Sequence, residues 1–254
     1  MSHLYFSYTG NKRKEYKYIK DKFNFDEIKN IIEPFCGSAA ISFNIWLEYG
    51  DKFNYYINDN DIKLIEIYKL FEITAPDIIY KKLTDIHKNI TNKEQFVELH
   101  INKNKNIYEY LTILKLSGIR LGWYNGKRVN NVFKYYSPLQ LKFLEFLKSD
   151  YVYISNNDWY EIFDKYKNDA TTIFIFDPPY INRDNTLYRK PSLNVYNYFK
   201  NNNINTFNSK IYFMLEDIPE IRELFETNTI YEPYEKKYCM KSIRNNTKHI
   251  IISN

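Results

Sequence analysis

The stretch Asp177-Pro178-Pro179-Tyr180 places an acid, two prolines and an aromatic side chain directly after an apolar run. A chance match to this tetrapeptide has odds of roughly one in a thousand or less. The Asp177 carboxylate and the Pro178 carbonyl could accept both N–H groups of an aromatic amine such as that of adenine. The nitrogen lone pair could then attack a sulfonium methyl group. The prolines fix the backbone, and Tyr180 offers a stacking face for a flipped base. A proline turn that merely ends a strand explains neither the acid nor the aromatic.

A second polar stretch, Glu33-Pro34-Phe35-Cys36-Gly37-Ser38-Ala39, follows the short apolar run 30–32. Gly37 allows a tight turn under a ligand, and Glu33 is placed for a polar group of a cofactor. Asp59 ends the next expected strand, where acids of nucleotide-binding α/β folds hydrogen-bond ribose hydroxyls. Two plainer interpretations stay open: Gly37 belongs to an ordinary turn, and Asp59 only caps the following helix.

Short apolar runs alternate with stretches of helical spacing along much of the chain. We expect strands at 30–32, 53–57, 151–154, 172–176, 211–215 and 249–252, and helices at 39–49 and 62–71. This alternation predicts an α/β fold with a mostly parallel sheet, whose ligands bind beyond the carboxyl ends of the strands. The polar strand ends near Glu33, Asp59, Asp158 and Asp177 should therefore gather at one edge.

Residues 76–149 differ from the flanking sequence, because they form amphipathic helical stretches joined by polar segments. We interpret this region as an inserted, mainly helical domain. Residues 1–75 and 150–254 would then build one catalytic α/β domain. A chain of 254 residues is long enough for such a domain with an insertion.

The composition narrows the class of protein. The net charge of +5 suits a polyanionic partner but supports one only weakly. Cys36 and Cys239 are far apart, so we expect neither a disulfide scaffold nor a metal site. No run of about 20 apolar residues occurs, and we expect an intracellular, cytoplasmic monomer without membrane contact. The aromatic content of 19% is explained by A/T-rich codons as well as by a base-stacking surface.

These stretches together resemble the Dam-like DNA adenine methyltransferases over most of the chain. Tyr8-Thr9-Gly10-Asn11-Lys12 is similar to the family's opening aromatic-x-Gly-Gly-Lys, and residues 33–39 are similar to its cofactor loop. Asn58-Asp59 resembles its ribose-binding Asn-Asp, and residues 123–128 resemble an Asn-Gly segment of its middle region. The order of cofactor loop, inserted recognition domain and catalytic tetrapeptide is also that of the family.

The resemblance implies a Rossmann-like class I methyltransferase sheet with an inserted target-recognition domain. It implies S-adenosylmethionine as the methyl donor and site-specific methylation of a flipped adenine in double-stranded DNA. Asp177, Pro178, Pro179 and Tyr180 would be catalytic, and Asp158 would approach the adenine of the cofactor. The implied cofactor-binding residues are Tyr8, Gly10, Lys12, Glu33, Pro34, Phe35, Gly37, Ser38, Asp59, Asp158 and Asp177. The recognised DNA sequence and any restriction partner stay open.

Two positions depart from the family pattern. Asn11 stands where the opening has its second glycine, but Asn tolerates a positive φ better than most residues. Ala39 replaces the second glycine of the cofactor loop. Its methyl group is expected to crowd the cofactor or to require a shifted backbone, so weak cofactor affinity is one expected consequence.

Cations and aromatics of the insert are candidates for contacts with DNA. We expect phosphate contacts from Lys103, Lys105, Lys115, Arg120, Lys127, Arg128, Lys134 and Lys142, although a solvated helix face explains most of the lysines. The candidate DNA-binding residues are Arg120, Trp123, Asn125, Lys127, Arg128 and Arg183. Of these, Arg120 and Arg128 are candidates for reading or wedging bases. The segment 183–192 is expected to close over a flipped base.

Three other functions compete with this interpretation. The same fold could methylate the amine of cytosine, but such enzymes more often carry Ser in place of Asp177. A non-catalytic nucleic-acid-binding relative is suggested by Ala39. A nicotinamide-dependent oxidoreductase would suit the sheet, but the chain has no GxGxxG loop and the double proline would be unexplained.

Overall fold

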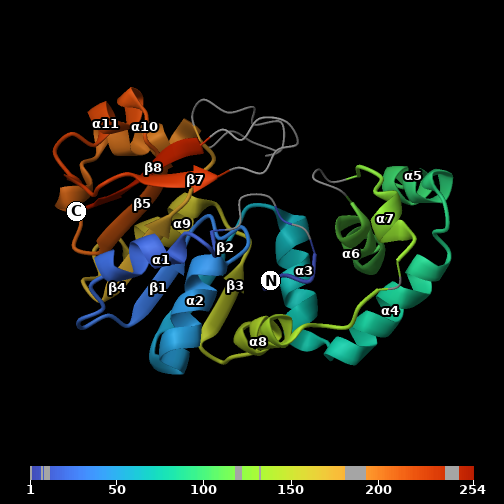
Figure 1. Ribbon diagram of the computed structural model, residues 1–254. Coiled ribbons are helices and arrows are strands. Elements are labelled where there is room, and N and C mark those ends of the chain that lie inside the picture. The colour runs from blue at the N-terminus through green and yellow to red at the C-terminus, as the bar shows by residue number, and fades with distance from the viewer. Residues whose placement is uncertain are drawn as a thin grey trace. The chain divides into compact units, whose positions relative to one another are not determined.

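The computed structural model describes residues 2–6, 8, 12–117, 122–131, 133–180, 193–237 and 246–254. The chain forms two compact units, and Figure 1 labels most of their helices and strands. Met1–Asn11 and Ile62–Ile154 make up one, which we call the helical unit. Lys12–Asp61 and Ser155–Asn254 make up the other, which we call the sheet unit. Within the described ranges, no helix has both the length and the apolar character needed to cross a bilayer.

The sheet unit is built on strands β1 (Asn30–Glu33), β2 (Asn54–Asn58), β4 (Thr172–Phe176), β5 (Lys210–Glu216), β6 (Thr229–Ile230), β7 (Tyr234–Lys237) and β8 (Asn246–Ser253). They follow the order β2-β1-β4-β5-β8-β6, and β7 also pairs with β8. Strands β2, β1, β4 and β5 are parallel, whereas β8 runs antiparallel to β5, β6 and β7. This mostly parallel sheet confirms the predicted α/β class with a Rossmann-like sheet.

The central position of β4 follows from its sequence, Thr-Ile-Phe-Ile-Phe, all of which is buried. Continuous apolar runs are typical of strands in parallel sheets, because helices cover both faces. In the register of the sheet, β1 pairs with β2 from Asn30↔Asn54 to Glu33↔Ile57, and with β4 at Ile32↔Phe174. The carboxyl ends of these three strands therefore reach the same edge.

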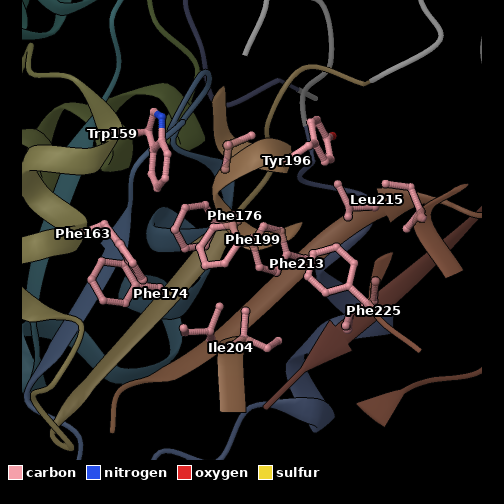
Figure 2. Packing of buried hydrophobic residues seen from close by; sticks show 14 of the residues in the cluster. Trp159, Phe163, Phe174, Phe176, Tyr196, Phe199, Ile204, Phe213, Leu215 and Phe225 are labelled. Carbon is pink, nitrogen blue, oxygen red and sulfur yellow. The ribbon is translucent and has the colours of Figure 1, made fainter. Parts of the chain in front are cut away.

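Helices of the sheet unit complete its core. They are α1 (Tyr16–Ile19), α2 (Ala40–Tyr49), α9 (Trp159–Tyr166), α10 (Leu193–Asn201), α11 (Pro219–Leu224) and the 3₁₀ helices η1 (Lys20–Lys22), η2 (Gly50–Lys52) and η4 (Ile204–Thr206). Figure 2 shows Phe163 of α9 and Phe199 of α10 packed with aromatics of the sheet. Among these, the rings of Phe176 on β4 and Phe213 on β5 stack with centroids 4.7 Å apart. This cluster anchors the end of β4, from which the tetrapeptide leaves.

The helical unit consists mainly of α3 (Ile62–Ile73), α4 (Pro76–Lys88), α5 (Lys93–Ile101), α6 (Ile107–Leu116), α7 (Gly126–Val129) and α8 (Pro138–Leu147), and β3 (Val152–Ser155) carries the chain onward. Helix α6 contacts α3, α4 and α5, and α3 also contacts α8. Two of the helices begin with capping boxes, formed by Asn106 with Glu109 and by Ser137 with Gln140. Such caps satisfy N–H groups that have no partner inside the helix.

The helical unit extends beyond residues 76–149. The sequence pattern predicts that α3 belongs with the sheet, but in the structure α3 packs on α6 and α8. The N-terminal segment also belongs here, because Tyr5 donates from its hydroxyl to the Lys134 carbonyl at 2.9 Å and Gln140 donates to the Leu4 carbonyl at 2.9 Å. Such long-range contacts leave no periodic signal in the sequence. The assignment of 76–149 to target recognition stays a prediction.

Candidate active site

Three acids mark the carboxyl edge of the parallel strands. Glu33 is the last residue of β1, Asp59 follows β2 and Asp177 follows β4. Because these strands are neighbours and run in the same direction, the three positions share one edge of the sheet.

Asp177 is held by two side chains. Its Oδ2 forms an ion pair with Nζ of Lys12, and its Oδ1 accepts a hydrogen bond from the Tyr180 hydroxyl at 3.4 Å. The Lys12 side chain is 7% exposed and that of Asp177 is 20% exposed. Solvent and salt therefore screen their attraction only weakly. Lys12 Nζ also lies 5.4 Å from the centroid of the Tyr180 ring. Lys12 thus supports the acid, and its contact with a cofactor stays a prediction.

The tetrapeptide is also supported from β8 and α10. The His249 ring meets the Tyr180 ring edge-on, with centroids 5.4 Å apart. The Tyr196 hydroxyl donates to the Pro179 carbonyl at 3.2 Å. Burial, and secondarily the Asp177 charge, raises the pKa of Tyr196, so this hydroxyl remains a donor. Sequence reasoning missed the roles of His249 and Tyr196, because no local pattern reveals which distant segment a ring packs against.

The loop between β1 and α2 contains two residues in the left-handed region. Gly37 has a φ of 46° and Ala39 has a φ of 50°. The Gly37 N–H donates to Oδ2 of Asp59 at 2.9 Å, which ties this loop to the one after β2. Ala39 is fully buried and is the N-cap residue of α2, with no side-chain capping hydrogen bond. The backbone here is therefore the one that glycine would favour.

Glu33 caps α2 from the end of β1. Its Oε1 accepts the N–H of Ser42 at 2.6 Å, within the first turn of the helix, and its side chain is buried. Backbone N–H groups at this end have no partner in the helix, and a negative charge suits the helix dipole. One oxygen of Glu33 is thus used by the helix. A contact between Glu33 and a polar group of a cofactor stays a prediction.

The charge of Glu33 is sensitive to its surroundings. Burial raises the pKa of the Glu33 carboxyl to about 7. Hydrogen bonds from Ser42 and the Lys12 ammonium oppose this rise, and the Asp177 charge adds to it. The carboxyl therefore gains and loses its proton near neutral pH.

Asp59 is fixed by main-chain donors. Its Oδ2 accepts the Gly37 N–H, and its Oδ1 accepts the N–H of Asp61 at 2.9 Å, two residues further along, as in an Asx turn. Burial raises the pKa of the Asp59 carboxyl, and these hydrogen bonds oppose part of that rise. A helix cap alone does not explain the bond to Gly37. The predicted ribose contact of Asp59 stays a prediction.

Other predicted cofactor residues of the sheet unit differ in exposure. Pro34 and Ser38 are buried, whereas Phe35 is half-buried, with its ring centroid 6.2 Å from that of Trp159. Asp158 is exposed and caps α9, since its side chain accepts the Tyr160 N–H at 2.9 Å. This cap fixes the start of α9, whose first residues are Trp159 and Tyr160.

The remaining predicted residues differ in burial and in the unit to which they belong. Within the tetrapeptide, Pro178 is buried. Tyr8 is half-buried and belongs to the helical unit. The positions outside the described residues are Gly10, Asn11, Arg120, Arg183 and the whole segment 183–192.

The candidate DNA-binding residues of the helical unit are mostly exposed. Trp123 is 57% exposed, and Lys127 is also on the surface. Asn125 caps α7 by accepting the Arg128 N–H at 3.3 Å. The Arg128 guanidinium donates to the Ser117 carbonyl. Trp123 and Lys127 thus lie on the surface, whereas Arg128 is held by the Ser117 carbonyl and the Asn125 side chain.

Lys115 is less suited to a phosphate contact than the sequence suggests. Its Nζ lies 3.1 Å from the centroid of the Tyr5 ring and donates to the Tyr5 carbonyl at 3.3 Å. Burial, together with the nearby Arg128, lowers the pKa of Lys115 to about 7. The amine therefore serves the packing of the N-terminal segment.

The model of one protein family matches the chain from residue 8 to residue 239. That family is described as the D12 class N6 adenine-specific DNA methyltransferase. The match includes all the candidate site residues and ends before His249. No curated protein matches the sequence.

Proposed function

Because the chain belongs to the D12 class N6 adenine-specific DNA methyltransferase family, we propose that its donor is S-adenosylmethionine and its acceptor is a flipped adenine in DNA. The family is one of enzymes that methylate adenine in DNA. The observation that carries the finer proposal is the position of Asp177. This acid follows β4 beside two prolines, is held by Lys12 and Tyr180, and shares an edge with the Gly37–Asp59 contact.

The proposed chemistry is orientation of a weakly nucleophilic amine. The Asp177 carboxylate and the Pro178 carbonyl accept its two N–H groups, which directs the nitrogen lone pair toward the methyl group. Each Asp177 oxygen already accepts one hydrogen bond, but a carboxylate oxygen has two lone pairs, so one remains for the base. S-adenosylmethionine, when bound, supplies the electrophilic methyl group. The protein contributes positioning and electrostatics, and no strong base is needed.

The flipped base stacks on Tyr180 in this proposal. The ring is partly exposed, while His249 and Lys12 lie against it. A ring supported in this way loses little additional freedom when a base stacks on it, which favours capture.

The loops after β1 and β2 suit an adenosine-containing cofactor. Asp59 is half-buried, and the main-chain N–H groups of Gly37, Asn60 and Asp61 occupy three of the four lone pairs of its carboxylate, so one remains for a ribose hydroxyl. Gly37 and Ser38 would lie beside the bound molecule, and Asp158 and Phe35 are the candidates for its adenine. In the helical unit, residues 76–149 would supply target recognition, with Trp123 and Lys127 at the surface.

A methyl-transfer assay tests the proposed function. The purified protein should move labelled methyl from S-adenosylmethionine to unmethylated DNA, and digestion to nucleosides should place the label on adenosine. Label on cytidine would favour the cytosine alternative. Binding of DNA without binding of S-adenosylmethionine would favour a non-catalytic relative. No transfer to DNA of any sequence would refute the proposal.

Asp177→Ala should strongly reduce transfer in a chain that still folds. The lost group acts on the reacting amine, and removal of one preorganised electrostatic group typically costs about 10²–10³-fold in kcat. Asp164→Ala is the matched control, because Asp164 pairs with Lys167 at the surface of α9. Turnover of Asp177→Ala at the rate of this control would contradict the assigned role.

A further inference from the structure

Asn58, the last residue of β2, is fully buried, and its side-chain amide makes four hydrogen bonds. Nδ2 donates to the carbonyls of Pro34 and Asn157, both at 3.0 Å. Oδ1 accepts from the Ser155 hydroxyl at 2.8 Å and from the Asn157 N–H at 2.9 Å. A primary amide has two donor hydrogens and two acceptor lone pairs. The hydrogen-bonding capacity of this side chain is therefore used completely.

The partners of Asn58 belong to different loops. Pro34 and Cys36 lie in the loop after β1, while Ser155 ends β3 and Asn157 lies in the loop before α9. The main chain adds a further link, because the Asn58 carbonyl accepts the Cys36 N–H at 2.8 Å. One uncharged residue thus joins the loops that follow β1, β2 and β3.

We propose that Asn58 is a positioning residue for the cofactor, whose amide sets the spacing of the loops that carry Gly37 and Asp59. This inference rests on the proposed use of S-adenosylmethionine at this edge. The amide is buried and its capacity is filled, so it has no group left for a ligand. Its influence therefore falls on cofactor affinity. Asp177 and Tyr180 are supported by other segments, so turnover at saturating cofactor should change little.

The pattern of partners requires an amide. A carboxylate has nearly the same shape but no donor hydrogen, and it would bring a negative charge to the carbonyl oxygens of Pro34 and Asn157. Asn58→Asp therefore changes the hydrogen bonding and charge without changing the volume. Asn54→Asp is the matched control, because Asn54 lies at the other end of β2 and donates to Asn30 at 3.1 Å.

Calorimetric titration with S-adenosylmethionine, beside steady-state kinetics, tests the proposal. Asn58→Asp should weaken binding by at least about tenfold, the usual effect of one unsatisfied buried polar group, while kcat at saturation stays within about threefold. Asn54→Asp should bind within about threefold of the wild type. Lowering the pH from about 8 to about 5.5 should restore part of the lost affinity relative to the wild type, because a protonated carboxyl regains one donor.

Several outcomes would overturn the positioning role. They are unchanged affinity in a folded Asn58→Asp protein, an equal loss in Asn54→Asp, a fall in kcat alone, or no recovery at lower pH. If Asn58→Asp does not fold, Ser155→Ala replaces it, since it removes only one bond to Oδ1. It should weaken binding about threefold, and unchanged affinity would refute the proposal. A wild-type protein that binds no S-adenosylmethionine refutes the proposed function itself, together with this inference. If the wild type binds S-adenosylmethionine and the variant binds it equally well, only the role of Asn58 is refuted.

Discussion

At the scale of single residues, Lys12 and Asp177 depend on each other. Lys12→Met keeps much of the side-chain volume but leaves the Asp177 carboxylate without its cation in a mostly buried position. Breaking a buried pair by removing one partner typically costs about 3–5 kcal/mol. We expect a misplaced acid and a fall in single-turnover rate of at least about 100-fold. Lys12→Arg, which keeps the charge, should retain more activity.

The control for this prediction is Lys167→Met. Lys167 forms a surface ion pair with Asp164, and exposed pairs contribute little to stability. This variant should turn over like the wild type. Equal rates for Lys12→Met and Lys167→Met would show that Asp177 does not need its cation.

Ala39 gives a second prediction at residue scale. Its left-handed backbone costs an alanine about 1–2 kcal/mol, which a glycine avoids. Greater backbone freedom in the unfolded chain offsets about 0.4–1 kcal/mol of this gain. Ala39→Gly should therefore raise the free energy of unfolding by up to about 1.5 kcal/mol in urea denaturation, with S-adenosylmethionine affinity equal or higher.

The neighbouring alanine is the control for Ala39→Gly. Ala40 is the first helical residue of α2, so Ala40→Gly should lower the free energy of unfolding by about 1 kcal/mol or less. The same substitution should therefore raise the free energy of unfolding at position 39 and lower it at position 40. A loss of stability in both would mean that Ala39 is not strained.

At the scale of elements, the N-terminus of α2 links stability to pH through Glu33. The pKa of Glu33 is raised from 4.5 to about 7, so between these values the folded chain holds a proton that the unfolded chain releases. This contribution to stability is complete below pH 4.5 and is lost as the pH rises through about 7. At about 1.4 kcal/mol per pKa unit, the loss of stability is at most about 3.5 kcal/mol.

Glu33→Gln tests this linkage. The amide keeps an oxygen for the Ser42 N–H and carries no charge, so the variant should lose this part of the pH dependence. Urea unfolding between about pH 5 and about pH 8 measures it. Glu145→Gln, at an exposed position of α8, should keep the wild-type profile. Equal pH profiles for wild type and Glu33→Gln would contradict a raised pKa.

At the scale of the whole molecule, the net charge of +5 predicts salt-sensitive binding to DNA. Each neutralised phosphate contributes a slope of about −0.9 to the logarithm of the binding constant against the logarithm of salt. Even two such contacts reduce affinity about tenfold between about 50 and 200 mM salt. Fluorescence anisotropy with a DNA duplex measures this slope. Binding of S-adenosylmethionine to the same protein should vary far less, and a salt-independent DNA affinity would contradict the prediction.

Local sequence was sufficient to predict much of the secondary structure and the family of this protein. Hydrophobic periodicity predicted the alternating strands and helices, and the apolar run 172–176 became the fully buried β4. The tetrapeptide from Asp177 to Tyr180 and the loop from Glu33 to Ala39 pointed to the correct family, which the match over residues 8–239 confirms. These features are short and contiguous, because a strand, a turn or a cofactor loop is specified by neighbouring residues.

Contacts between distant segments could be identified only in the folded chain. Lys12 pairs with an acid 165 positions away. Asn58 bonds to Pro34, Ser155 and Asn157, which lie 24, 97 and 99 positions away from it. The partner of a buried polar group depends on which segments packing brings together and on the need to satisfy every donor and acceptor away from water. That choice is made by the tertiary fold, so the sequence predicted candidate residues of the site but not how they hold one another.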